Sequence, residues 1–220
     1  LQADRRPEGG VAVQGIFTLP STKAWLALRY LIDESGSLRL TAGLDDVSED
    51  LPEIPRFGTT WRLPARLVNA SWYGRGPHAS YWDRKTGAAV GRYESRITDL
   101  PHAYARPQET GNRADTRWVA LTDAEGAGLL VIRETGWFDF SASNYAPGDL
   151  DGGRIAAGHR RERRKHVDVG LYLQQALGDP YRSAVVLQHH RERFPRRRDG
   201  IADGSEAPAG QRRPLDAPGF

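Results

Sequence analysis

The chain has 220 residues, 39% of them hydrophobic, and a formal net charge of +3. It contains no cysteine, which excludes disulfide bonds, thiolate catalysis and cysteine-ligated metals. No apolar run approaches the roughly 18–20 residues needed to cross a bilayer, so we expect no membrane partner. This length suits one domain. Because methionine is also absent, we expect a chain that is processed or cut from a longer polypeptide.

The first predicted elements are short strands. For residues 1–20 we expect a linker or an extension from a preceding domain. Strands are predicted at residues 23–32 and 37–44, joined by the turn DESG, which closes on Gly36. The pair therefore predicts a β-hairpin.

The central part of the sequence continues this pattern. In residues 59–73, Trp61, Leu63, Ala65 and Leu67 are apolar at every second position, and Pro64 confines part of the segment to a sheet edge or a bulge. Strands are also predicted at residues 115–123, 128–134 and 136–145. Short strands at this spacing, with hardly any helical stripe, predict an all-β fold, an antiparallel sandwich or barrel.

The C-terminal third differs in composition. Residues 154–220 carry 14 basic and 8 acidic residues, so the basic surplus of the chain lies there. Residues 167–177 fit either a strand or a helix. Residues 181–220 are rich in proline, glycine and charge, and we predict a basic, disordered tail. The domain is then expected to span residues 21–180.

Catalytic side chains are hard to find in this sequence. Glycosidases need two carboxylates flanking the scissile bond, whereas the acids here cluster in turns, as in DDVSED at 45–50. His78 and His102 lie in the predicted domain without a second histidine at metal spacing, and a hydrogen-bonding role is favoured for both. No nucleophile elbow or phosphate-binding glycine loop is present. We therefore expect no catalytic residue, cofactor or metal site in this chain.

Two basic runs raise the question of nucleic-acid binding. They are RRERRK at 160–165 and RERFPRRR at 191–198. Arginine side chains neutralise phosphates, but these runs have almost no interleaved aromatic residues and no recognition helix. A solvated tail is favoured, and nucleic acid is not an expected partner.

The segment WYGRGPHASYWDR, residues 72–84, could carry a sugar-stacking platform. Its aromatic residues are Trp72, Tyr73, Tyr81 and Trp82. Aromatic faces pack against the apolar patches of sugars. The spacing, however, places Trp72 at a strand end and the Tyr81–Trp82 pair after a glycine–proline loop. Aromatic residues that fix the loop to a sheet are the favoured interpretation.

The same segment resembles a motif of glycoside hydrolase family 2 β-galactosidases, in their C-terminal (small-chain, domain 5) region. The matching residues are Trp72, Gly74, Gly76, Pro77, Tyr81, Asp83 and Arg84. A second block at 105–123 is similar to a P-Q-E-x-G-x-R-x-D-x-R-W pattern. It supplies Gln108, Glu109, Gly111, Arg113, Arg117 and Trp118. Residues 54–64 and 140–151 also resemble the family, in the same order.

The resemblance implies an antiparallel supersandwich related to galactose mutarotases. The catalytic glutamates, with magnesium and sodium, would lie in a barrel domain or large subunit that is absent here. This chain would be a non-catalytic C-terminal domain or small subunit, acting in a cytoplasmic oligomer that hydrolyses terminal β-galactosides such as lactose. The resemblance implies weak substrate-binding candidates at Trp72, Tyr81 and Tyr181.

The sequence departs from the family in several places. Ala79 stands where the family usually has glutamate, and Trp82 replaces a common proline. Beyond Arg182 the resemblance ends, so the sandwich is expected to be incomplete at its C-terminal side. Two alternatives stay open, a stand-alone carbohydrate-binding module and a mutarotase-like epimerase. The epimerase would need His78 or His102 as its acid.

Overall fold

The protein is a two-layer assembly of antiparallel strands. A computed structural model describes residues 1–20, 22–48, 56–102, 104, 108–134, 136–145, 166–173 and 182–191. Within these residues the only helical turn is the 3₁₀ segment η1, Ile97–Asp99, and no helix is long and apolar enough to cross a membrane.

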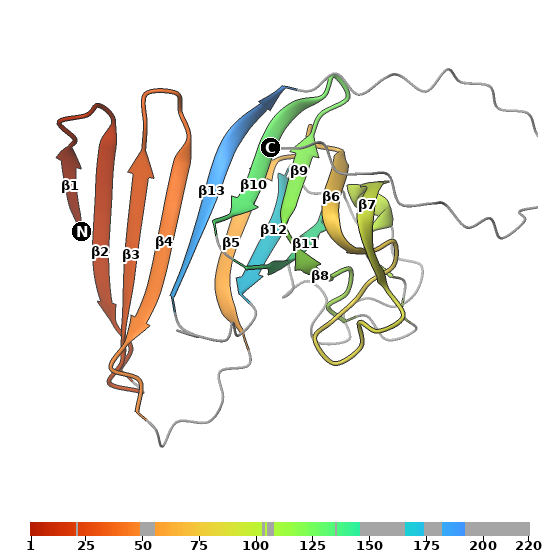
Figure 1. Ribbon diagram of the computed structural model, residues 1–220, viewed down its shortest axis with the longest axis horizontal. Coiled ribbons are helices and arrows are strands. Elements are labelled where there is room, and N and C mark those ends of the chain that lie inside the picture. Colours follow the sequence, from red (N-terminus) through yellow and green to blue (C-terminus); the bar gives the residue numbers. More distant parts are fainter. Residues whose placement is uncertain are drawn as a thin grey trace, which may run out of the picture.

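The larger layer is a sheet of nine strands (Figure 1). In spatial order they are β1 (Gln2–Arg5), β2 (Val11–Thr18), β3 (Trp25–Ile32), β4 (Leu38–Asp45), β13 (Arg182–Arg191), β10 (Ala127–Arg133), β9 (Trp118–Thr122), β6 (Asn69–Gly76) and β7 (Ala89–Arg96). Every neighbouring pair is antiparallel. Strand β13 thus joins the N-terminal strands to the centre of the sheet.

The smaller layer is a sheet of four strands. Its order is β5 (Phe57–Pro64), β12 (His166–Leu173), β11 (Phe138–Ser143) and β8 (Arg113–Thr116). Its neighbouring strands are also antiparallel. The predicted all-β antiparallel sandwich is therefore confirmed.

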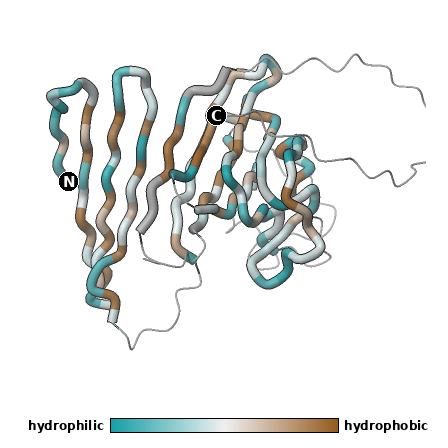
Figure 2. The backbone as a smooth tube through the Cα atoms, viewed as in Figure 1, coloured by the Kyte–Doolittle hydropathy of each residue, from teal (hydrophilic) through white to brown (hydrophobic). Residues whose placement is uncertain are grey.

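Alternation of apolar and polar residues explains why these segments form strands. Side chains of successive strand residues point to opposite faces, and β6 and β11 bury every second residue. Figure 2 shows this interleaving of hydrophobic and hydrophilic residues along the strands. Gly36 and Gly126 have φ of 81° and 83° in the hairpin turns, where a side chain would be strained. The antiparallel pairing of β3 with β4 confirms the hairpin predicted at 23–44.

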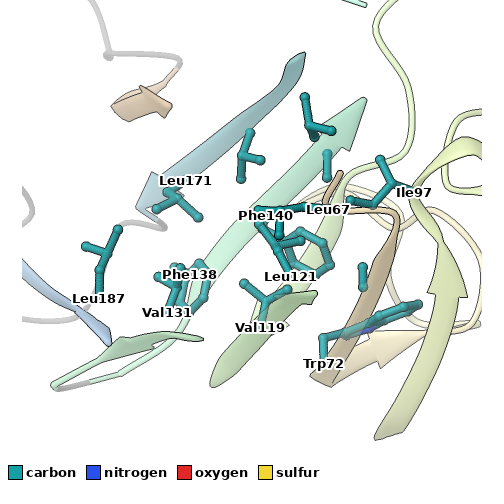
Figure 3. Close-up of a cluster of buried hydrophobic side chains, with 14 of the residues drawn as sticks. Leu67, Trp72, Ile97, Val119, Leu121, Val131, Phe138, Phe140, Leu171 and Leu187 are labelled. Carbon is teal, nitrogen blue, oxygen red and sulfur yellow. The ribbon is translucent and has the colours of Figure 1, made fainter. Parts of the chain in front are cut away.

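The core lies between the two sheets (Figure 3). Phe138 and Phe140 of β11 contribute the aromatic centre from the small sheet, and both are fully buried. Val119, Leu121 and Val131 of β9 and β10 face them from the large sheet. The small sheet therefore covers the central strands of the large one.

Several sequence-based boundaries need correction. Residues 1–20, predicted as a linker, contain β1 and β2, because VAVQGIFT can pair with the β3 strand along its whole length. The predicted 59–73 strand is two strands in different sheets, interrupted after Pro64. The ambiguous 167–177 segment contains the β12 strand.

The predicted tail at 181–220 also changes. Its first part contains β13, which pairs with β4 and β10. Val185 and Leu187 of this strand are buried. The rest of that segment, from 192 onward, lies outside the described residues.

Candidate functional site

Trp72 is the first residue of the segment that the sequence singled out, and it lies in the core. Its exposed fraction is 0%, and its indole Nε1 donates a hydrogen bond to the Arg75 carbonyl at 3.0 Å. Its ring packs against Tyr93 and Phe140, with centroids 5.6 and 5.7 Å apart. Figure 3 shows Trp72 at one end of the apolar cluster. A fully buried ring has no free face on which a sugar could stack.

The two glycines of the motif allow close packing around β6. A Cβ atom added at Gly74 would lie 2.9 Å from the Thr116 Cα, and one at Gly76 would lie 2.7 Å from the Tyr93 ring. Real Cβ atoms do not approach other atoms so closely without displacing them. The G-x-G spacing therefore reflects the contact of β6 with β7 and β8.

The loop after Pro77 is attached to the start of β8. Ser80 is fully buried, its hydroxyl accepts a hydrogen bond from the Ala114 N–H at 3.0 Å, and its carbonyl accepts one from the Asn112 amide at 2.8 Å. Tyr81 and Arg84 then form an isolated antiparallel bridge, and the Arg84 guanidinium lies 4.4 Å from the Tyr81 ring centroid. Burial raises the pKa of Tyr81. Asp83 is exposed at the turn.

Asp115 is the centre of a buried charge cluster. It is 2% exposed and accepts hydrogen bonds from Arg75 Nε and from Lys85 Nζ, the latter at 2.8 Å. Arg75 also donates to the Lys85 and Ala88 carbonyls. Two cations and two carbonyls thus tie β6, the following loop and β8 together.

The second motif block is structural as well. Glu109 forms an ion pair with Arg56 at 2.8 Å, and Gly111 has φ of 88°, a conformation that favours glycine. The Arg117 guanidinium lies 4.7 Å from the Trp137 ring centroid, and Trp118 lies beneath Arg92 at 5.5 Å. Gln108 is exposed.

Arg113 is the buried cation of this block. It is 3% exposed, and its Nη1 donates to the Gly111 carbonyl at 2.8 Å. Its guanidinium lies 5.2 Å from the Trp72 ring centroid. Burial lowers the pKa of Arg113 to about 10, because a charged group loses hydration in the interior.

A cleft of about 520 Å³ opens beside these loops, within the usual range of small-molecule sites. Its walls are formed by Trp72, Pro77, His78, Ala79, Glu94, Ser95, Asp99, Leu100, Pro101, His102, Tyr104 and Arg113. The two histidines and the two carboxylates are all exposed. Its polar side chains could form hydrogen bonds with a ligand, and the cleft is the candidate site of the described part of the chain.

The cleft does not contain an assembled acid–base pair. The His102 ring packs against Tyr104, with centroids 4.6 Å apart. Within the described residues, no hydrogen bond or ion pair joins the side chain of His78 or His102 to a carboxylate. Nothing in the sequence indicated that Glu94 and Asp99 share the cleft with these histidines, since Glu94 belongs to β7 and Asp99 to η1.

Comparison with known proteins gives the family of the chain. The model of the β-galactosidase small chain matches residues 3–194. The chain belongs to this family. The expected relationship is confirmed, and the match begins within β1, in agreement with the corrected N-terminal boundary.

The chain is similar to several proteins that are named β-galactosidase. The chain is 35% identical to one from Priestia megaterium over 133 residues, which are 60% of this chain and 13% of that protein. It is 43% identical to one from Vibrio cholerae over 102 residues, 46% of this chain and 9% of the relative. For one from Lactobacillus delbrueckii, identity is 35% over 145 residues, 66% of this chain and 14% of the relative. The chain thus spans only about a tenth to a seventh of their length.

The predicted substrate-binding residues lie in different places. Trp72 and Arg113 border the cleft, while Tyr81 belongs to the adjoining loop. Tyr181 lies outside the described residues. Within the part that the structure describes, no group of three or more histidines and carboxylates could hold a metal ion.

Proposed function

We propose that this chain is a non-catalytic part of a β-galactosidase, either a C-terminal domain or a separate small subunit. It would complete the galactoside site and the oligomer of an assembly that hydrolyses terminal β-galactosides such as lactose. The match to the small-chain family over residues 3–194 carries the proposal. The proposal includes a cytoplasmic location, as the resemblance implies.

The chemistry of the described residues supports a non-catalytic role. The motif residues hold loops together, as Asp115 does with Arg75 and Lys85. Glu94 and Asp99, the carboxylates of the cleft, are exposed. Glycosidases instead need an acid and a second carboxylate held rigidly across the scissile bond.

The partner in this proposal is a larger chain that supplies the catalytic barrel. The magnesium and sodium ions that the resemblance implies for the assembly would belong to that chain. The galactoside would be bound where the two chains meet. This assignment gives the small chain a supporting part in substrate binding.

Hydrolysis of o-nitrophenyl β-galactoside tests the proposal. The purified chain should show no turnover. Mixed with Priestia megaterium β-galactosidase that lacks the 133 matching residues, it should restore turnover that neither piece has alone. Robust hydrolysis by the chain alone, or no gain on mixing, would count against the proposal.

A matched pair of variants distinguishes this role from an epimerase. His78→Ala and His102→Ala remove the two histidines of the cleft, and both variants should still restore turnover, because neither histidine is proposed to act as an acid. An epimerase that used either histidine as its acid would interconvert the α and β forms of galactose, and the corresponding variant would lose that activity. Polarimetry of α-galactose with the purified chain measures it directly.

A further inference from the structure

Arg113 is a buried cation that uses only part of its hydrogen-bonding capacity. It is the first residue of β8 and is 3% exposed. A guanidinium group has five N–H donors. Nη1 donates to the carbonyls of Gly111 at 2.8 Å and Asn112 at 3.4 Å, whereas the buried Nε has no acceptor among the described residues. Nη2 has none among them either, so one edge of the guanidinium is free.

The charge of Arg113 is not balanced by a carboxylate. Its pKa, lowered by burial to about 10, still leaves the guanidinium charged at neutral pH. The phenol of Tyr81 is the titratable group that acts on it, and burial raises the pKa of this phenol, so Tyr81 is neutral there. No ion pair joins Arg113 to another described residue. Buried charges are normally paired, because an unpaired one loses its hydration without compensation.

The free edge of Arg113 lies beside the cleft. Arg113 and Trp72 both line the cleft, and the guanidinium lies 5.2 Å from the Trp72 ring centroid. Trp72, at one end of the apolar cluster in Figure 3, thus covers one face of the guanidinium. The carbonyls of Gly111 and Asn112 hold Nη1. The cleft is then the side from which an acceptor can reach the free edge.

We propose that the cleft binds a small sugar acid, whose carboxylate pairs with Arg113. A carboxylate has two oxygens, and these can accept hydrogen bonds from Nε and Nη2 together, in the bidentate geometry that arginine favours. The pair would neutralise the buried cation and give its unused donors their acceptors. The ligand is therefore recognised first by its negative charge.

The other walls of the cleft suit the hydroxyl groups of a sugar. Hydroxyl groups both donate and accept hydrogen bonds, and the C–H groups of a sugar ring pack against apolar surfaces. The volume of about 520 Å³ suits a ligand of this size. Polar side chains line the cleft at His78, Glu94, Ser95, Asp99, His102 and Tyr104, and apolar ones at Pro77, Leu100 and Pro101.

Two carboxylates of the cleft limit the charge of the ligand. Glu94 of β7 and Asp99 of η1 line the cleft and are exposed. Water and salt screen exposed charges strongly, whereas a buried charge such as that of Arg113 is screened much less. A single carboxylate beside Arg113 is therefore attracted, while a doubly charged phosphate group would meet more repulsion from the two acids. The expected ligand is a monoanion.

Ala79 offers a position from which the chain itself could supply the carboxylate. The next residue, Ser80, donates its N–H to the Asn112 carbonyl at 2.9 Å, and its hydroxyl accepts from the Ala114 N–H at 3.0 Å. These bonds hold the loop against both chain neighbours of Arg113, and Ala79 lines the same cleft as Arg113. A glutamate at position 79 could therefore reach the free edge and compete with the ligand.

An NMR titration of the ¹⁵N-labelled full chain with D-galacturonate tests the proposal. The Arg113 Nε–H signal, identified by its loss in Arg113→Lys, should shift, with a Kd on the order of 1 mM. D-Galactose is the matched control, because it has the same ring with a neutral group at C6, and it should bind at least about tenfold more weakly. Acetate supplies a carboxylate without the hydroxyl groups and should also bind at least about tenfold more weakly.

Variants of Arg113 and Ala79 give a second measurement. Arg113→Gln removes the charge and should abolish binding of galacturonate, and circular dichroism shows whether this variant keeps the fold. Ala79→Glu leaves Arg113 in place and should weaken binding at least about tenfold more than Ala79→Gln, which has nearly the same volume without the charge. At pH 7, Ala79→Glu should also have a Tm roughly 2 °C or more above that of Ala79→Gln, because its carboxylate supplies the missing partner.

Several results would overturn the proposal. One is an Arg113 Nε–H signal that stays in place at about 50 times the expected Kd. Equal binding of galactose and galacturonate would show that charge plays no part, and equal binding of acetate would refute the sugar-acid class. Equal affinity and equal Tm of Ala79→Glu and Ala79→Gln would refute the assignment of the carboxylate to Arg113.

This proposal goes beyond the proposed function, and neither depends on the other. The titration uses the purified chain alone and measures binding, whereas restored hydrolysis needs a second polypeptide. Each experiment can therefore fail while the other succeeds.

Discussion

Strands β9 and β10 and strands β2 and β3 belong to the same sheet and all carry apolar residues, yet the apolar residues of the first pair are more deeply buried. Val119, Leu121 and Val131 are at most 1% exposed, whereas Phe17 is 47% exposed. The difference comes from the small sheet, which covers one half of the large sheet. Alternation thus determines which face of a strand is apolar, while burial depends on a second layer from elsewhere.

The most direct way to test this comparison is to truncate the same residue type in each half. Phe138→Ala should lower the free energy of unfolding by about 3–5 kcal/mol, because it leaves a cavity in the closed core. Phe17→Ala should lower it by less than about 1 kcal/mol, since a half-exposed ring loses little burial. Urea unfolding of the two variants measures both losses. Equal losses would show that the two halves are equally packed.

Removal of a buried charge in the covered half should have the next largest effect. Asp115→Ala leaves Arg75 and Lys85 without their shared carboxylate. These cations are still 24% and 22% exposed, so we expect a loss of about 2–3 kcal/mol, below that of a fully buried pair. Asp83→Ala removes an exposed carboxylate and should change stability by less than about 0.5 kcal/mol. Thermal unfolding of the two variants gives the difference, and a stable Asp115→Ala would contradict the structural role of the cluster.

The close approach of strands near the cleft predicts a smaller effect. Gly74→Ala places a Cβ 2.9 Å from the Thr116 Cα, and relief of that overlap should cost about 1–3 kcal/mol. Gly87 has open space at its Cβ position, so Gly87→Ala should be neutral or slightly stabilising. Urea unfolding compares the two alanine variants. A neutral Gly74→Ala would mean that β6 and β8 separate easily.

The sequence predicted the fold class because strand alternation and turn glycines are local signals. The hairpin turn that closes on Gly36 and the placement of Pro64 on an edge strand were predictable for this reason. The sequence missed β13, because its place between β4 and β10 depends on pairing with strands far away in the chain. It missed β2 because the flanking segments resemble a linker.

The candidate site was less predictable than the fold. The burial of Trp72 agrees with the preference for packing over sugar stacking. The cleft itself combines Pro77–Ala79, Glu94, Asp99, His102 and Arg113, and no spacing in the sequence relates these positions. Only the folding of β6, β7 and η1 brings them together, so residue type alone could not define the site.

The smallest effect is expected in the hairpin turn of the uncovered half. Asp33 Oδ1 accepts hydrogen bonds from the Ser35 hydroxyl at 2.6 Å and from the Ser35 and Ser37 N–H groups at 2.9 and 3.0 Å. The Ser35 hydroxyl is the largest cause of a lowered pKa at Asp33, with the backbone donors adding to it. A lowered pKa means that the ionised carboxylate stabilises the folded state above the ordinary value of 3.8, and that this contribution is lost as pH falls through the folded pKa.

Ser35→Ala removes the main cause and should move the pKa of Asp33 back toward its ordinary value. A ¹³C NMR titration of the Asp33 carboxyl in both proteins measures the change. Ser48→Ala, a serine outside the turn, should leave it unaltered. Because Asp33 is exposed, the effect on overall stability should be minor and should fade as salt is added. An unchanged pKa in Ser35→Ala would show that the turn does not hold this hydrogen bond in solution, and that order in the uncovered half ends before the hairpin tip.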